Sequence, residues 1–298
     1  MHLSLQIEGV SKRYKGNNSL ALNNLSLEIE PGVLGLLGPN GAGKSTLMRI
    51  IATITKPTRG TVYYNRADIS LNPEVLRKVL GYLPQDFGVY PNLNADEFLQ
   101  YMAAIKGIDS RSAKQRIDDL LVFVDLLEAR KRPLGGYSGG MKQRIGIAQA
   151  LLNDPLILIV DEPTVGLDPE GRLRFRHLLA ELAGDRIVIL STHIVSDVEA
   201  VANDIAIINQ GHLVQRSSSE DLLKMVDDKT WDWVIPSSDL QSVKQKHLLS
   251  NVIRRKDGLQ VRVIADERPV QEAQHVDSPT LEEAYLYCIS LGVGRDSV

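Results

Sequence analysis

The sequence predicts an α/β protein whose core is a mostly parallel β-sheet covered by helices. Three short apolar runs, "VLGLLG" (33–38), "LILIV" (156–160) and "IVIL" (187–190), lack polar–apolar alternation, which is typical of strands buried on both faces. Each run is followed at once by polar residues. In an open α/β sheet, ligands bind at the carboxyl ends of the strands. The three strands are therefore expected to bring polar groups to one edge of the sheet.

Length and composition are those of an ordinary globular protein. The chain has 298 residues, of which 43% are hydrophobic and 24% charged, enough for one large domain and a smaller one. The net charge of −3 gives no general electrostatic reason to bind nucleic acid, so no nucleic-acid partner is expected. No apolar run approaches the length of a membrane span. If the protein works at a membrane, another chain is expected to do the crossing.

Other stretches predict the parts that surround the parallel sheet. Residues 3–32 and 60–65 combine strand-like alternation with turn residues, which favours antiparallel strands beside it. Residues 93–130 carry apolar residues at helical spacing, and we expect a helical subdomain over about residues 90–152.

A change in the composition of the sequence near residues 215–220 indicates a domain boundary. A serine run is followed by strand-like pieces, "TWDWVIP" and "GLQVRVIA". The final segment, "SPTLEEAYLYCISLG", has capping-box spacing at Thr280 and Glu283. We therefore expect a main domain over residues 1–221 and a small α/β accessory domain over residues 222–298.

The stretch after the first buried strand fits the phosphate-loop pattern. Glycines let backbone N–H groups turn inward around phosphates, and the helix that follows adds a dipole that favours anions. Lys44 would supply a positive charge to the terminal phosphates, and the Ser45 hydroxyl would ligate Mg²⁺. The loop residues before this lysine are Gly38, Pro39, Asn40, Gly41, Ala42 and Gly43.

Further candidates follow other predicted strands. Asp161 suits Mg²⁺, and Glu162 would accept a proton from an attacking water, although paired carboxylates after a strand can also simply cap a helix. His193 at the same edge would bond a γ-phosphate and the water, although a lone histidine is usually a surface or satisfied core residue. The Gln85 amide oxygen would ligate Mg²⁺ or a water. Tyr14 is predicted either to stack on a nucleobase or to be a plain sheet residue.

A second glycine pair lies in "YSGGMKQR" (137–144). Apolar residues recur after Ser138, Gly139 and Gly140 at helical spacing, which places the glycines at a helix N-terminus, a site that favours anions. This device belongs to the helical subdomain, whereas Lys44 lies at the sheet edge. Two molecules arranged head to tail would close both devices around the same ATP, and a C2 dimer with two ATP molecules at its interface satisfies this arrangement.

Together these residues resemble a known family. The segments "GPNGAGKST", Gln85, "YSGGMKQR", "LILIVDEPTVGLDP" and His193 occur in the order found in ATP-binding subunits of ABC transporters, over about residues 3–220. The resemblance implies the ABC ATPase fold, a P-loop NTPase fold, with ATP and Mg²⁺ as cofactors. It also implies these roles: Lys44, Ser45 and Thr46 at the phosphates, Gln85 and Asp161 around Mg²⁺, Glu162 as general base, His193 as γ-phosphate switch, Tyr14 on adenine, Ser138, Gly139 and Gly140 on the partner's ATP, and Asp168 at the dimer seam.

Some residues depart from the usual family pattern. Tyr137 stands where many members have leucine, and Met141 and Lys142 stand where many have glutamine and arginine. This variant and the closing "SPTLEEAYLYC" resemble the subfamily that drives ABC-2-type exporters, whose ATPases pair with separate permease chains. Residues 86–105 would then face the permease, although packing within the helical subdomain would explain their apolar cluster as well.

The resemblance leads to one main hypothesis and an alternative. The main hypothesis is an ATPase subunit, in a homodimer or pseudo-dimer at the cytoplasmic face of the membrane, that powers export through a separate transmembrane permease. The alternative is a soluble ABC ATPase that acts on ribosomes or DNA. Such chains usually carry two cassettes or a long coiled-coil insertion, and this sequence has one phosphate loop and no heptad run.

Overall fold

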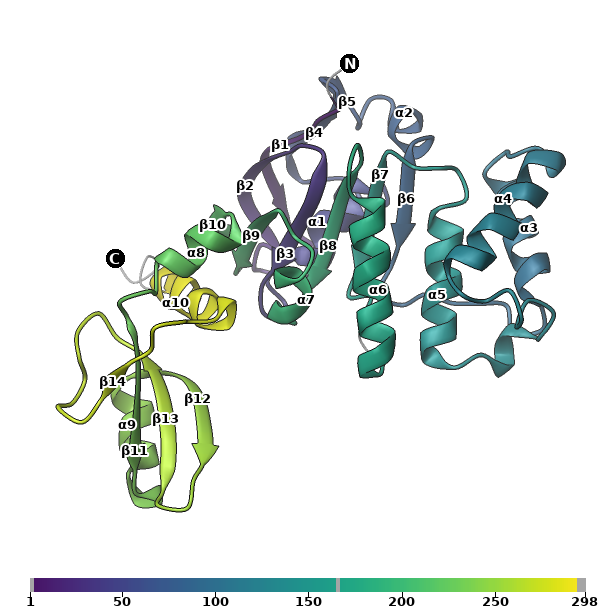
Figure 1. Ribbon diagram of the computed structural model, residues 1–298. Coiled ribbons are helices and arrows are strands. Elements are labelled where there is room, and N and C mark those ends of the chain that lie inside the picture. Colours follow the sequence, from purple (N-terminus) through teal and green to yellow (C-terminus); the bar gives the residue numbers. More distant parts are fainter. Residues whose placement is uncertain (1–2, 165–166, 294–298) are drawn as a thin grey trace.

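The computed structural model describes residues 3–164 and 167–293, and its centre is a six-stranded sheet (Figure 1). Neighbouring strands in the sheet are parallel, except that the first strand of the spatial order is antiparallel to the second. In spatial order the strands are β10 (His212–Ser217), β9 (Asp204–Asn209), β3 (Gly32–Leu37), β8 (Ile187–Thr192), β7 (Ile157–Asp161) and β6 (Leu80–Leu83). The three apolar runs form β3, β7 and β8 and are buried almost throughout, which confirms the predicted parallel sheet.

An antiparallel sheet covers one side of the central sheet, as residues 3–32 and 60–65 predicted. Its strands, in spatial order, are β2 (Leu22–Ile29), β1 (Leu5–Lys12), β4 (Arg59–Tyr64) and β5 (Ala67–Asp68). Helix α1 (Lys44–Ile51) shares an apolar core with both sheets, whereas the short α2 (Pro73–Arg77) precedes β6. The core fixes α1 against the end of β3.

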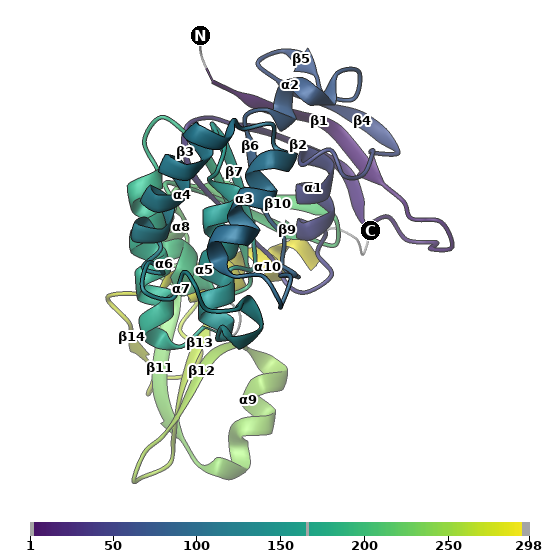
Figure 2. The ribbon, with the colours of Figure 1, turned by 90° about the vertical axis from the view of Figure 1, so that its right-hand side faces the viewer.

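The helices of the predicted helical subdomain pack against one another at one side of the molecule, which faces the viewer in Figure 2. They are α3 (Ala95–Ile105), α4 (Ser110–Phe123) and α5 (Gly139–Ala150), with a 3-10 turn at Leu134–Gly136 before α5. Each begins at a side-chain cap, because Asn94, Asp109 and Ser138 accept hydrogen bonds from backbone N–H groups of the first turn. Helices α6 (Pro169–Leu182) and α7 (Val195–Glu199) follow β7 and β8.

The C-terminal part contains a second antiparallel unit with its own small core. Helix α8 (Ser219–Lys224) precedes a sheet with the spatial order β12 (Leu248–Arg254), β13 (Leu259–Ile264), β11 (Thr230–Ile235) and β14 (Gln274–His275). A 3-10 turn at Ser237–Asp239 and α9 (Leu240–Lys246) connect β11 to β12. Trp233, Val261 and Val263 are at the centre of this small core.

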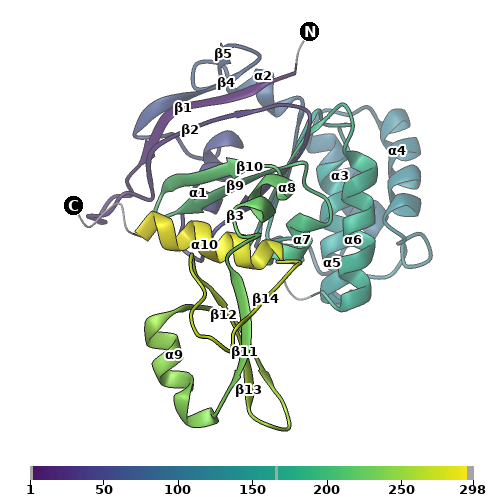
Figure 3. The ribbon, with the colours of Figure 1, turned by 60° about the vertical axis from the view of Figure 1, so that its left-hand side comes forward.

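The last helix, α10 (Leu281–Val293), lies between the accessory sheet and the main domain (Figure 3). Leu281, Ala284 and Cys288 are buried in the large core of the main domain, and α10 contacts α7, α8, β9 and β10 as well as β12. The accessory domain predicted over residues 222–298 includes α10. In the structure this helix packs on both parts.

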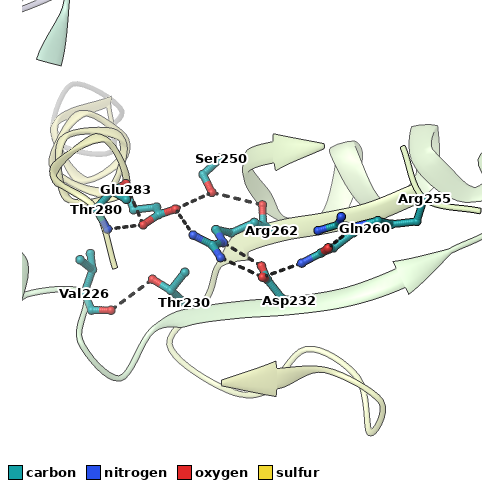
Figure 4. Close-up of polar contacts among 9 residues, drawn as sticks. All are labelled: Val226, Thr230, Asp232, Ser250, Arg255, Gln260, Arg262, Thr280 and Glu283. Carbon is teal, nitrogen blue, oxygen red and sulfur yellow. Dashed lines mark hydrogen bonds and ion pairs between the residues drawn. The ribbon is translucent and has the colours of Figure 1, made fainter. Parts of the chain in front are cut away.

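A polar network fastens α10 to the accessory sheet (Figure 4). Arg262 on β13 donates two hydrogen bonds to the Asp232 carboxylate, at 2.8 and 2.9 Å. The same guanidinium lies 3.4 Å from Glu283 Oε1, in the first turn of α10. Glu283 also accepts a hydrogen bond from Thr280, the residue directly before α10, so its carboxylate links the start of this helix to β13.

Candidate active site

The predicted phosphate loop lies between β3 and α1, and its backbone explains its glycines. Gly41 and Gly43 have φ of 82° and 108°, a left-handed region that favours glycine. A Cβ on Gly38 would lie 2.2 Å from the Ile208 carbonyl oxygen, and a Cβ on Gly43 would lie 2.4 Å from that of Ala21. The loop is therefore packed against β9 and the segment before β2. The remaining loop residues are Pro39, Asn40 and Ala42, with the Ala42 N–H bonded to the Pro39 carbonyl.

Lys44 is the first residue of α1, and its side chain is almost fully buried. Its ammonium group donates to the carbonyls of Gly38 (2.7 Å) and Pro39 (3.2 Å) and lies 3.7 Å from Glu162 Oε1. Burial lowers the pKa of Lys44, although the carboxylates of Glu162 and Asp161 act in the opposite direction. The ammonium is thus held under its own loop, beside the carboxylate at the end of β7.

Asp161 ends β7 and is 1% exposed, next to the hydroxyl of Ser45. Ser45 Oγ donates to Asp161 Oδ1 over 3.3 Å. Burial raises the pKa of Asp161, and Glu162 adds to the increase. A hydroxyl and a carboxylate are oxygen ligands that suit Mg²⁺. The third predicted ligand, Gln85, is exposed in the loop after β6, and its side chain makes no hydrogen bond to any other described residue.

Glu162 stands at the point where the chain leaves β7. Its φ of 50° lies in the left-handed region, and its N–H is bonded to the Ser191 carbonyl of β8. One carboxylate oxygen faces Lys44, and the other, Oε2, is 2.7 Å from Nδ1 of His193. Strained backbone at a site of this kind persists when the surroundings hold it. The Glu162 carboxylate is therefore buried between a cation and an imidazole. A carboxylate in this position is able to accept a proton.

Tyr14 lies after the end of β1, so the alternative of a plain sheet residue does not describe it. Its hydroxyl is 3.4 Å from Thr46 Oγ1, and Lys12 Nζ lies 5.2 Å from the centre of its ring. The ring is 37% exposed beside the phosphate loop. This position leaves a face of the side chain open to solvent next to α1.

The second glycine pair, Gly139 and Gly140, lies away from the residues around Lys44. Ser138 caps α5 by accepting from the Met141 N–H, and Asp168 caps α6 by accepting from the Gly171 N–H. Together with Gly139 and Gly140, both capping residues line a cavity of about 420 Å³ between α5 and α6. Lys44, Glu162 and His193 do not line this cavity. Val165 and Gly166, which belong to the same motif as Asp168, lie outside the described residues.

The tyrosine that departs from the family pattern has a structural use. Tyr137 is 4% exposed, and its hydroxyl donates to the Ala129 carbonyl over 2.9 Å. A leucine at this position would fill the core without making this bond. Tyr137 therefore helps to hold the segment before the glycine pair against the loop after α4.

Sequence reasoning missed a buried contact between the segments that carry Glu162 and His193. Thr164 Oγ1 donates to Asp197 Oδ2 over 2.6 Å. The two residues are 33 positions apart, and an aspartate in the first turn of a short helix is ordinarily a helix-terminal charge. The only signal in the sequence was position, since each residue follows a strand of the active edge within a few residues.

These features define a class of protein. A buried strand, a glycine-rich loop and a helix that opens with a lysine, with an aspartate at the end of another strand of the same sheet, are the parts of a phosphate-loop NTPase. The antiparallel sheet and the helical subdomain around this core narrow the class to the ABC ATPases.

Comparisons with known proteins agree with this class. The ABC transporter family model matches residues 22–165. An uncharacterized ABC transporter ATP-binding protein, YxlF of Bacillus subtilis, is 38% identical over 219 residues, which cover 73% of this chain and 72% of the relative. The Nod factor export ATP-binding protein I of Cupriavidus metallidurans is 34% identical over 221 residues, which cover 74% of this chain and 72% of that relative. The dimeric structure of MJ0796, a bacterial ABC transporter cassette, is 28% identical, with a TM-score of 0.65 over 72% of this chain and 98% of that one.

The chain belongs to the ABC transporter family, as an ATP-binding protein of that family. Its enzymatic class is therefore that of the ABC ATPases, as the sequence predicted. In the part of the chain that the structure describes, no helix is both long and apolar enough to cross a membrane.

Proposed function

We propose that this chain is the ATP-hydrolysing subunit of an exporter, and that two such subunits close around two ATP molecules. The main observation behind the proposal is that two phosphate-binding motifs, the loop with Lys44 and the glycine pair of α5, lie apart on one chain. The lysine, carboxylates and histidine gather at the carboxyl edge of the central sheet, whereas the glycine pair and Asp168 line a cavity between α5 and α6. A second subunit, turned by a two-fold axis, supplies the missing half of each site.

In each site the chain's own residues have separable tasks. The phosphate-loop N–H groups and Lys44 bind the phosphates, for which Lys44 must leave the loop carbonyls. Glu162 accepts the proton of the attacking water, and His193 holds the carboxylate and contacts the γ-phosphate. Tyr14 stacks on the adenine. The Ser138 hydroxyl and the N–H groups of α5 bind the phosphates held by the partner.

Mg²⁺ would neutralise phosphate charge in this site. Ser45 and Asp161 would hold it, because their oxygen atoms are adjacent and are of the type that Mg²⁺ prefers. Gln85 would complete the set from the loop after β6. The raised pKa of Asp161 fits such a site, since a carboxylate buried without a full set of partners is better stabilised once a cation is bound.

The permease is proposed to dock on the segment after Gln85. Tyr90 and Tyr101 are 52% and 47% exposed, and their rings meet edge to face with centroids 5.6 Å apart. Phe87 packs inward against the buried Phe98, so only part of the aromatic cluster serves the subdomain core. Half-exposed tyrosines on a rigid base are typical of interface surfaces. The names of relatives, such as the Nod factor export protein, support export as the direction of transport.

Purification of the tagged protein from its native membranes, at low detergent, tests this function. We expect a polytopic membrane protein to co-purify, and to be lost when Tyr90→Ser and Tyr101→Ser are combined. Leu71→Ser is the matched control, because Leu71 is 84% exposed and lies between β5 and α2, outside the helical subdomain. The membrane protein is expected to co-purify with this variant. Recovery of ribosomal proteins or DNA in place of a membrane protein would favour the soluble alternative.

A further inference from the structure

A buried hydrogen bond joins the two segments that carry Glu162 and His193. Thr164 and Asp197 are 0% and 2% exposed, and the hydroxyl of the first lies 2.6 Å from the carboxylate of the second. Thr164 lies two residues after Glu162, and Asp197 lies four residues after His193. The same two segments are therefore joined twice, by the Glu162–His193 contact and by this buried bond.

The Asp197 end of this bond is fixed to the central sheet. Asp197 lies in α7, and Val198 of the same helix packs so closely on β3 that a Cβ on Gly35 would lie 2.2 Å from its Cγ1. The same helix also contacts α10. A helix confined in this way offers the Thr164 hydroxyl a fixed acceptor, and a buried bond of this length to a carboxylate is among the stronger hydrogen bonds of proteins.

Glu162 itself is weakly held by its own backbone. It has left β7, its φ of 50° is in the left-handed region, and one backbone bond, to the Ser191 carbonyl, holds its N–H. A restraint two residues further on limits how this turn can relax. Without it, the turn would be free to move the carboxylate away from the imidazole.

We propose that Asp197 is a positioning residue for ATP hydrolysis, which acts through Thr164 to hold the Glu162 carboxylate against His193. This inference rests on the proposed function, in which Glu162 is the general base. Thr164 and Asp197 are almost fully buried, so neither side chain is expected to contact a bound nucleotide. Their removal should therefore lower kcat and leave the KM for ATP nearly unchanged, because misplacement of a reacting group by about 1 Å costs about 100-fold in rate.

The test compares two replacements of one side chain. Thr164→Val keeps the shape and removes the hydroxyl, whereas Thr164→Ser keeps the hydroxyl. We expect Thr164→Val to lower kcat about 10- to 100-fold with a KM within about twofold of wild type, and Thr164→Ser to recover most of the rate. Thr230→Val is the matched control, since Thr230 is also 0% exposed and bonds the Val226 carbonyl, but lies in the accessory sheet. Its kcat should stay at the wild-type value.

A second arm separates positioning from general loosening of the fold. In a Glu162→Gln background the base is already gone, so adding Thr164→Val should change the residual rate by less than about twofold. A full additional loss in that background, an unchanged kcat in Thr164→Val alone, or a failure of Thr164→Ser to recover the rate would overturn the inference.

Two further measurements keep the inference testable. If Thr164→Val does not fold by circular dichroism, Asp197→Asn replaces it, because the amide oxygen still accepts a hydrogen bond, though without charge assistance. We expect a smaller loss of kcat at unchanged KM, and a wild-type kcat would overturn the inference. A Glu162→Gln chain with near wild-type hydrolysis would instead refute the proposed function. An inactive Glu162→Gln together with a fully active Thr164→Val would refute this inference alone.

Discussion

The residues of the proposed catalytic cluster bind one another. Lys44 donates to two carbonyls of its own loop and faces Glu162, which in turn contacts His193. These contacts keep buried charges paired, which limits their desolvation cost. Phosphates entering the loop would compete with the carbonyls and the carboxylate for the same ammonium group.

Lys44→Ala tests this exchange. We expect ATP affinity to fall and hydrolysis to stop, because the phosphates lose their fixed cation. The melting temperature without nucleotide should fall as well, because the buried Glu162 carboxylate loses the cation beside it. Calorimetric titration with ATP and a phosphate-release assay measure both effects, with Lys114→Ala on the exposed face of α4 as control. Near-normal hydrolysis in Lys44→Ala would contradict the phosphate-loop assignment.

Sequence alone predicted the positions of these residues, because each follows a buried strand of one parallel sheet. It did not predict their pairing. The Lys44–Glu162 contact and the Thr164–Asp197 bond depend on the left-handed turn at Glu162 and on the placement of α7, and neither has a local signature. The roles assigned to these residues, and those assigned to Gln85, Tyr14 and Asp168, remain predictions.

At the scale of elements, one buried ion pair organises the helical subdomain. Asp96, in the first turn of α3, is 4% exposed and accepts hydrogen bonds from Arg130, which also pairs with Asp118 on α4. Burial raises the pKa of Asp96, but the hydrogen bonds and charges of Arg130 and Lys131 together outweigh it, so this pKa lies below its ordinary value. Arg130 thus joins α3 to α4 through two carboxylates.

Asp96→Asn is expected to destabilise the protein by about 1.5–3 kcal/mol at neutral pH, the range for hydrogen bonds to charged groups. A carboxylate with a depressed folded-state pKa contributes stability above its unfolded pKa of about 3.9, and this contribution is lost as the pH falls through the folded value. The difference between wild type and variant should therefore shrink below about pH 4. Urea unfolding from pH 7 to pH 3 measures it, with Asp118→Asn, at a 38% exposed side chain, as the weaker control. A difference independent of pH would exclude the charge as its cause.

Elements with strong local patterns were predicted, and those that depend on packing were not. The uninterrupted apolar runs gave β3, β7 and β8, and β11 and β13 also matched their predicted segments. Strand β12 and helix α9 were not predicted. The residues of β12 are half-buried or exposed, and α9 buries none of its side chains. Neither segment therefore shows a clear periodicity of hydrophobic residues.

At the scale of the whole molecule, α10 joins two parts that the sequence analysis separated. Its apolar face enters the main core, while the carboxylate of Glu283 faces Arg262 of the accessory sheet. A sequence shows that a helix is amphipathic but not which of two neighbours it covers. The proposed assembly of two chains is supported at the same scale by the separation of the glycine pair from Lys44.

Two chains are proposed to enclose ATP, and hydrolysis assisted by Glu162 is proposed to release them. The Glu162→Gln variant tests both parts. The variant keeps the shape of the side chain and removes its charge and basicity, so ATP should bind and two chains should close, while hydrolysis falls by about 100- to 10,000-fold. Adding Gly139→Asp, which places a carboxylate beside the partner's phosphates, is the control and should prevent closure.

Size-exclusion chromatography with Mg²⁺ and ATP, followed by phosphate release on the same fractions, is the most direct measurement. We predict that Glu162→Gln elutes as a lasting dimer of the 32.9-kDa chain, that wild type stays largely monomeric or in exchange, and that the Gly139→Asp control stays monomeric. A Glu162→Gln chain that hydrolyses ATP within a few-fold of wild type would contradict its role as the base, and one that is inactive but never dimerises would contradict the shared-site dimer.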